Sequence, residues 1–86
     1  MPMIKLIKFY TQTCGPCKMM KPIVDSLIHN HPEVEYEEVD CTQGVPEEWE
    51  GEIRNVPTII IIKGDSKVKI VGIKTYEYLE DIIKNE

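Results

Sequence analysis

The motif Cys14-Gly15-Pro16-Cys17 places the tightest constraint on what this chain folds into. It stands where an apolar stretch that predicts a β-strand gives way to a stretch that predicts a helix. Two thiols separated by two residues close into a disulfide, or open again, with little movement of the backbone. The same spacing also serves zinc sites, metallochaperones and permanent structural bridges, so the motif alone leaves these alternatives open.

Length and charge narrow the class of protein. The chain has 86 residues, 42% hydrophobic and 29% charged, which allows one domain (residues 1–86) with one core. No stretch approaches the roughly 20 apolar residues that cross a bilayer, so we expect no membrane association. A net charge of -5 disfavours nucleic acid as a partner, because phosphate binding needs a basic face.

The cysteine count and the N-terminal residues indicate a compartment. Residues 1–5 show no charged leader followed by an apolar region and a cleavage site, so nothing predicts export. Three cysteines are too few for a disulfide scaffold. We therefore expect a cytoplasmic protein in a reducing environment.

Hydrophobic periodicity predicts the elements on either side of the motif. Residues 3–10 are apolar at both parities, which is typical of a strand buried on both faces inside a sheet. After the motif, two apolar rows with a spacing of four predict a helix with one wide apolar face. The rows are Met19, Ile23, Leu27 and Met20, Val24, Ile28. They continue past Pro22, so we expect a kink there, with the start of a second helix as the alternative, and an end near Asn30.

The middle of the chain gives weaker signals. Residues 34–39 alternate in polarity and predict a half-buried strand at a sheet edge. Residues 40–45 predict a loop. Residues 46–54 begin with proline and contain Gly51, which indicates a short helix or a turn.

The last third predicts a hairpin and a helix. Four consecutive isoleucines mark residues 58–63 as a buried strand. A turn at 64–66 and residues 67–71 form its antiparallel partner. Thr75 caps a final helix. Its buried stripe is expected to be Leu79, Ile82 and Ile83. A right-handed crossover makes the first two strands parallel, giving the order β-α-β-α-β-β-α and a four-stranded mixed sheet.

Several motifs in this order resemble the thioredoxin family from about Met3 to the C-terminus. They are the 14–17 motif, the helix continuation at 18–22, Val39-Asp40, Val56-Pro57-Thr58 and Gly72. The resemblance implies a minimal α/β thioredoxin fold, with helices on both faces of the sheet and without the family's extra N-terminal strand and helix.

The position of the two cysteines predicts their roles. Cys14 meets the unpaired amides and partial positive charge of a helix start, which favour the thiolate, so we expect it to be the nucleophile. Cys17, one turn later on the same side, then attacks Cys14 and releases the substrate as the resolving thiol. Gly15 lets another chain approach closely, and Pro16 costs no hydrogen bond in a first helical turn.

The resemblance also implies a substrate groove. Val56-Pro57-Thr58 matches the family's cis-proline loop, in which the Val56 backbone pairs with an extended substrate segment. Gly72 matches a glycine beside that groove. Thr13 stands where thioredoxins usually carry tryptophan, which leaves substrate preference open. The alternative for Pro57 is that it only starts a strand.

Lys8 is the largest departure from the family pattern. Thioredoxins have a buried aspartate six residues before the first cysteine, and their matching lysine on the second strand falls near Tyr36 here. We therefore do not carry over that acid-base role. Our hypothesis is that a half-buried Lys8 favours thiolate at Cys17 as a modulator. The alternative is that its stem packs while its ammonium reaches water.

The third cysteine has two interpretations. Cys41 follows the second strand and is either a regulatory or dimer-forming thiol or, more commonly, a small packing residue. With only this third sulfur, and with His29 and His31 lacking the usual ligand spacing, we expect no metal.

Taken together, the sequence predicts a thiol-disulfide oxidoreductase that reduces protein disulfides. The resemblance implies a thioredoxin reductase as the electron donor, and we expect a monomer without a bound cofactor. Two alternatives stay open. One is a glutaredoxin-like, glutathione-dependent donor, for example to ribonucleotide reductase; the other is a binding subunit that uses the thioredoxin surface as a scaffold.

Overall fold

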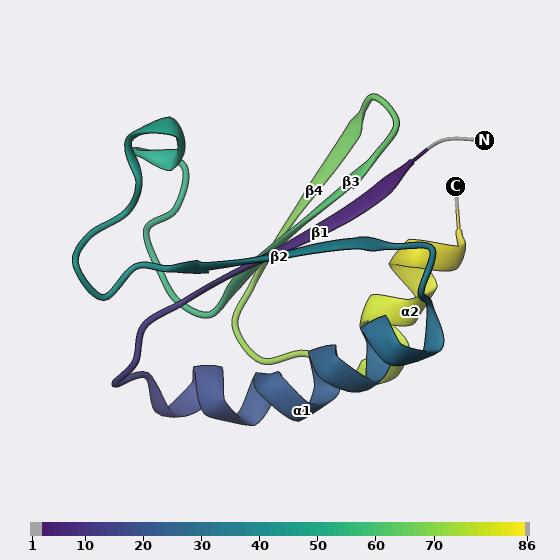
Figure 1. Ribbon diagram of the computed structural model, residues 1–86, viewed down its shortest axis with the longest axis horizontal. Coiled ribbons are helices and arrows are strands. Elements are labelled where there is room, and N and C mark those ends of the chain that lie inside the picture. The colour runs from purple at the N-terminus through teal and green to yellow at the C-terminus, as the bar shows by residue number, and fades with distance from the viewer. Residues whose placement is uncertain (1–2, 86) are drawn as a thin grey trace.

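The computed structural model describes residues 3–85 and contains one mixed sheet and two α-helices (Figure 1). The elements are, in chain order, β1 (Ile4–Tyr10), α1 (Gly15–Asn30), β2 (Glu35–Asp40), the 3-10 helix η1 (Glu47–Trp49), β3 (Thr58–Lys63), β4 (Ser66–Val71) and α2 (Tyr76–Lys84). This is the predicted order, with the middle helix reduced to a single 3-10 turn.

The sheet has the strand order β2-β1-β3-β4. Strand β1 runs parallel to β2 and antiparallel to β3, and β3 pairs antiparallel with β4. The mixed sheet, the interior position of β1 and the edge position of β2 are therefore confirmed. Because parallel strands end at the same sheet edge, the loop that follows β1 and the loop that follows β2 lie together.

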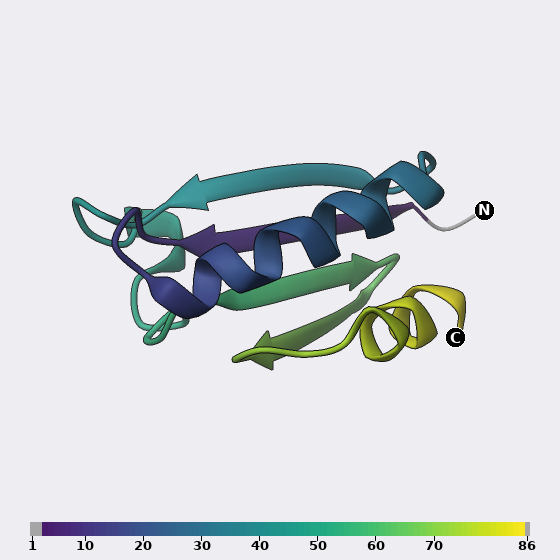
Figure 2. The same cartoon turned by 90° about the horizontal axis from the view of Figure 1, so that it is seen from below.

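Two groups of buried side chains cover the two faces of the sheet. Both α-helices pack on one face of the sheet (Figure 2). The core between them and the sheet includes Leu6, Ile59 and Ile61. On the other face, Ile7, Phe9 and Ile60 lie beneath the segment 41–57, which contains η1. The prediction of helices on both faces of the sheet is therefore wrong for α-helices, because both α-helices lie on one face. The second face is closed by a loop, whose Trp49 ring meets Phe9 edge to face at 5.0 Å between centroids.

Helix α1 buries a narrower stripe than its sequence predicts. It is one continuous helix across Pro22, so the alternative of a second helix starting there is wrong. Met20 is fully buried, but Met19 is 60% exposed, which corrects its placement on the apolar face. Successive residues turn about 100° around a helix, so both methionines cannot face one sheet. Ile23 and Ile28 are half-buried at the border of the stripe.

The remaining boundaries lie close to those predicted. Strand β2 begins one residue after the buried Val34. It is more exposed than the half-buried strand that was predicted, with Tyr36 and Val39 partly buried and its other four residues exposed. Thr75 caps α2 as predicted, its hydroxyl oxygen accepting from the Tyr78 N–H at 3.1 Å. Within the described part of the chain, neither helix has the length and apolar character needed to cross a membrane.

Candidate active site

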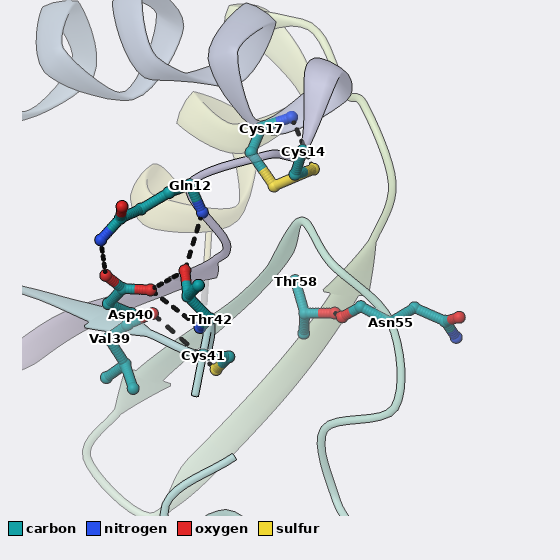
Figure 3. Close-up of a disulfide and its surroundings, with 9 residues drawn as sticks. All are labelled: Gln12, Cys14, Cys17, Val39, Asp40, Cys41, Thr42, Asn55 and Thr58. Atoms are coloured by element: carbon teal, nitrogen blue, oxygen red, sulfur yellow. Dashed lines mark hydrogen bonds between the residues drawn. A yellow bond between two sulfur atoms is a disulfide. The ribbon is translucent and has the colours of Figure 1, made fainter. Parts of the chain in front are cut away.

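The two cysteines lie at the start of α1 and form a disulfide (Figure 3). Cys14 is the N-cap residue, and Cys17 lies in the first turn, with their Cα atoms 5.2 Å apart. Cys14 is half-buried, whereas Cys17 is only 5% exposed. An incoming molecule therefore reaches the first sulfur more readily than the second.

The helix start provides a favourable field for charge on Cys14. Its Sγ accepts a hydrogen bond from the Cys17 N–H at 3.1 Å, as a capping side chain does. Pro16 occupies the first turn, where a missing N–H leaves no bond unmade, and that turn contains no acidic residue. The unpaired amides and the helix dipole favour a thiolate at Cys14 once the disulfide is reduced.

Gly15 lies exposed between the cysteines. Its φ is not positive, and a Cβ built on it would meet nothing within 4 Å. Nothing within the described chain demands a glycine here. The open space above Gly15 faces outward, which is consistent with the predicted close approach of a second chain.

The proline loop lies at the same edge of the sheet. The Val56-Pro57 peptide bond is cis, as predicted. Because Phe9 pairs with Thr58, this loop leaves the sheet where β1 runs on to the cysteines. The N–H of Gly72 donates to the Pro57 carbonyl at 3.0 Å, which joins the loop after β4 to it. Gly72 has φ 92°, so its own backbone conformation already favours glycine. Thr13 is exposed beside Cys14.

Lys8 is buried, with 3% exposure, and its charge is paired. Its Nζ lies 2.9 Å from Glu38 Oε2, on the neighbouring position of β2, and 5.5 Å from the Tyr10 ring centroid. The alternative in which the ammonium reaches water is therefore wrong. The hydrogen bond from Lys8 holds the pKa of the Glu38 carboxyl below its usual range. Both side chains line a cavity of about 240 Å³ that Cys17 also lines.

A hydrogen-bonded clasp, made of Gln12, Asp40 and Thr42, holds the loop before Cys14 (Figure 3). The Gln12 N–H donates to Thr42 Oγ1 at 2.9 Å, and its side-chain amide donates to Asp40 Oδ2 at 2.8 Å. The Thr42 N–H donates to Asp40 Oδ1 at 2.8 Å. Hydrogen bonds to the carboxylate, the largest effect coming from Thr42 and the next from Gln12, hold the pKa of Asp40 below its ordinary value.

Glu38 and the clasp were not predicted from the sequence. One signal was local: an aspartate two residues before a threonine is typical of a turn in which the carboxylate bonds the backbone. The contact between Glu38 and Lys8 could not be predicted without the strand register, since the two residues meet only when β1 and β2 align as they do.

Cys41 is a free thiol buried in the second core group. It is 7% exposed, and burial, with the nearby Asp40 charge, raises the pKa of its thiol. Its backbone N–H donates to the Tyr10 carbonyl at 2.7 Å. This environment agrees with the packing role rather than a reactive one.

The described residues contain no group of three or more histidine, cysteine, aspartate or glutamate side chains arranged to hold a metal ion. His31, which lacks the usual ligand spacing from His29, contacts the Glu80 carboxylate at 2.8 Å.

Comparison with known proteins gives consistent matches. The family model described as Thioredoxin matches residues 3–85. A thioredoxin of Chlamydia pneumoniae is 30% identical over 79 residues, covering 91% of this chain and 78% of the relative. The mitochondrial thioredoxin of Mus musculus is 36% identical over 81 residues, or 92% of this chain and 49% of that protein. The X-ray structure of Fasciola hepatica thioredoxin superposes with a TM-score of 0.79 at 28% identity, covering 98% and 82% of the two chains.

Proposed function

This chain belongs to the thioredoxin family and is a thiol-disulfide oxidoreductase that reduces protein disulfides, and from this premise we propose how its residues divide the reaction. The observation that carries the proposal is the contrast between the accessible Cys14 at the α1 N-cap and the buried Cys17 behind it. One sulfur meets the substrate, and the other is kept for the second step.

In the reducing direction, the Cys14 thiolate attacks one sulfur of a substrate disulfide. A mixed disulfide forms, and the other substrate sulfur leaves as a thiolate that takes a proton from water. The Cys17 thiolate then attacks Cys14 Sγ, closing the Cys14–Cys17 disulfide and expelling the second substrate thiolate. Two electrons pass from the dithiol to the substrate, and the oxidised protein is the form that the structure contains.

The surrounding loops form the substrate-binding surface in this proposal. The backbone at Val56, before the cis-Pro57, pairs with an extended segment of the substrate. Gly15 and Gly72 leave room for that segment, and Thr13 contacts it where it enters. This assignment is supported by the shared sheet edge and by the bond between Gly72 and Pro57.

A reductase must restore the dithiol after each turnover. We propose a thioredoxin reductase as this partner, with the protein acting as a monomer in the cytoplasm. The Gly-Pro pair between the cysteines, which the family associates with reducing couples, supports this choice over glutathione.

Insulin reduction tests the proposal. The wild-type protein is expected to precipitate reduced insulin when supplied with NADPH and a thioredoxin reductase, and to do so poorly with glutathione and glutathione reductase. Cys14→Ser and Cys17→Ser are expected to lose the activity, while Cys41→Ser keeps it. Efficient turnover with glutathione alone would overturn the choice of donor, and activity in Cys14→Ser would overturn the mechanism.

Trapping identifies the substrates and separates the two thiols. Cys17→Ser is expected to stop at the mixed disulfide, so that partners stay bound through Cys14 until a reductant is added. Cys14→Ser, treated identically, is the control and is expected to retain none. Equal retention by both variants would contradict the assigned roles.

A further inference from the structure

Lys8 is a buried cation that lines the same cavity as Cys17. Lys8 lies on the α1 side of β1, two residues after Leu6, which belongs to the core under α1. A lysine with 3% exposure is unusual, because removing an ammonium from water is costly unless it is paired. Its position therefore calls for a specific interaction.

The cavity of about 240 Å³ brings this ion pair and Cys17 to one space. Lys8 and Tyr10 line it from β1, and Glu38 lines it from β2. Helix α1 contributes Cys17, Lys18 and Lys21. Among the described residues, Cys17 is the one cysteine that shares this space, since Cys41 packs on the opposite face of the sheet.

The charges around the cavity are predominantly positive. Three lysines and one carboxylate line it, and Lys21 is itself paired with the exposed Asp25 at 3.1 Å. Burial raises the pKa of Tyr36, which packs beside Glu38, so its hydroxyl stays neutral. The proline loop and Gly72, which meet at this edge of the sheet, bring no charge of their own.

The two ends of the ion pair are screened unequally. Lys8 is enclosed by protein, whereas the Glu38 side chain is 41% exposed. A charge in the low-dielectric interior acts on its neighbours more strongly than one that faces water. Cys17, which is also buried, therefore experiences the ammonium more than the carboxylate.

We propose that Lys8 is a positioning residue for the second step, whose buried positive charge stabilises the Cys17 thiolate, an inference that rests on the proposed function. Glu38 holds the ammonium in place by the 2.9 Å contact. Before attack, Cys17 gives its proton to solvent. Its sulfur then bonds to Cys14 Sγ, and the substrate thiolate leaves and is protonated by solvent.

Direct titration of Cys17 tests this proposal. In the Cys14→Ser, Cys41→Ser background Cys17 is the only thiol, and its ionisation is followed by ultraviolet thiolate absorbance. The spectrum of the same protein with Cys17→Ser is subtracted at each pH, which removes the tyrosines. This readout does not require a reagent to reach the buried sulfur.

Two substitutions of Lys8 and one of Lys5 separate the effect of the Lys8 charge from that of its packing. Lys8→Met keeps the stem and removes the charge, and is expected to raise the midpoint of Cys17 ionisation by about one pH unit. Lys8→Arg keeps the charge and has the cavity to occupy, so its midpoint stays near that of the parent. Lys5→Met removes the corresponding charge from a 3.0 Å pair with Glu37 on the same two strands but the opposite face, and is expected to shift nothing.

The outcomes are distinct from those of the insulin assay. An unchanged midpoint in folded Lys8→Met, an equal shift in Lys5→Met, or an equal shift in Lys8→Arg would each overturn the inference. If Lys8→Met does not fold, Lys8→Gln, which also removes the charge, takes its place: a raised Cys17 midpoint supports the inference, and an unchanged one overturns it. Failure of the inference about Lys8 would leave insulin reduction by the wild-type protein intact. If instead Lys8→Met raised the Cys17 midpoint as expected but the wild-type protein did not reduce insulin, the proposed function would be overturned.

Discussion

At the scale of single residues, burial gives three cysteines three different environments. Cys14 lies at a helix cap and is partly accessible, Cys17 is enclosed one turn later, and Cys41 is packed in the core under η1. Thiol reactivity follows thiolate fraction and access, so the same chemical group is expected to react differently at each of the three positions, as the proposed roles of Cys14 and Cys17 require.

Cys41 is therefore expected to react slowly. In the Cys14→Ser, Cys17→Ser background its alkylation by iodoacetamide at pH 7 is expected to be at least about tenfold slower than in the same protein unfolded in guanidinium, because burial raises its pKa and blocks access. Mass spectrometry over time measures both rates. Similar rates in the folded and unfolded protein would show that Cys41 is available for regulation.

At the scale of elements, α1 shows how packing selects one face of a helix. Its buried residues are Cys17, Met20, Val24 and Leu27, at spacings of three and four. Met20 also accepts a hydrogen bond at Sδ from the Lys74 N–H at 3.5 Å, which ties the loop after β4 to the helix. Met19 is an equally apolar neighbour that points to solvent.

The two adjacent methionines form a matched pair for measuring this selection. Met20→Ala is expected to lower the free energy of unfolding by about 2–5 kcal/mol, through lost burial and a new cavity. Met19→Ala is expected to change it by about 0.5 kcal/mol or less, since it leaves the core intact. Urea unfolding of both variants measures the difference. Equal losses would mean that Met19 also packs against the protein.

At the scale of the whole molecule, a polar network fastens the end of α1 to α2. Glu80 of α2 accepts from the His31 ring at 2.8 Å and from the Tyr76 hydroxyl at 3.2 Å. Asn30 donates to the same hydroxyl at 2.8 Å. The bond from His31 holds the pKa of Glu80 below its ordinary value of 4.5. The network links segments that lie about half the chain apart.

This pairing predicts an acid-dependent part of the stability. The pKa of Glu80 is lowered in the folded protein, so the unfolded chain binds more protons just below pH 4.5, and the stabilisation is complete above that pH and lost as pH falls through the folded value. Glu80→Gln is expected to melt at a lower temperature than wild type at pH 6 and to approach it near pH 3. The control is Asp81→Asn, which neutralises an exposed carboxylate on the same helix. Its melting temperature is expected to differ from that of wild type by the same amount at pH 6 and at pH 3. A pH-independent difference for Glu80→Gln would remove Glu80 from the acid response.

Much of the fold could be predicted from the sequence, because its signals are local. The apolar run of β1, the isoleucines of β3, the cap at Thr75 and the turn at Gly64 each act within a few residues, and each produced the expected element. The motif at 14–17 likewise places both cysteines at a helix start, and their spacing indicated that they can form the disulfide, whereas the cis-proline was expected from family resemblance.

The tertiary structure alone decided which of these residues meet. Lys8 and Glu38 face each other only because two strands separated by a whole helix align in one register, and Gln12 reaches Asp40 for the same reason. Met19 and Met20 are adjacent and chemically identical, but only Met20 is buried when α1 packs on the sheet. Local chemistry specifies an element from its own residues, whereas contacts, burial and the charge near a sulfur depend on packing between distant segments, which no short stretch of sequence encodes.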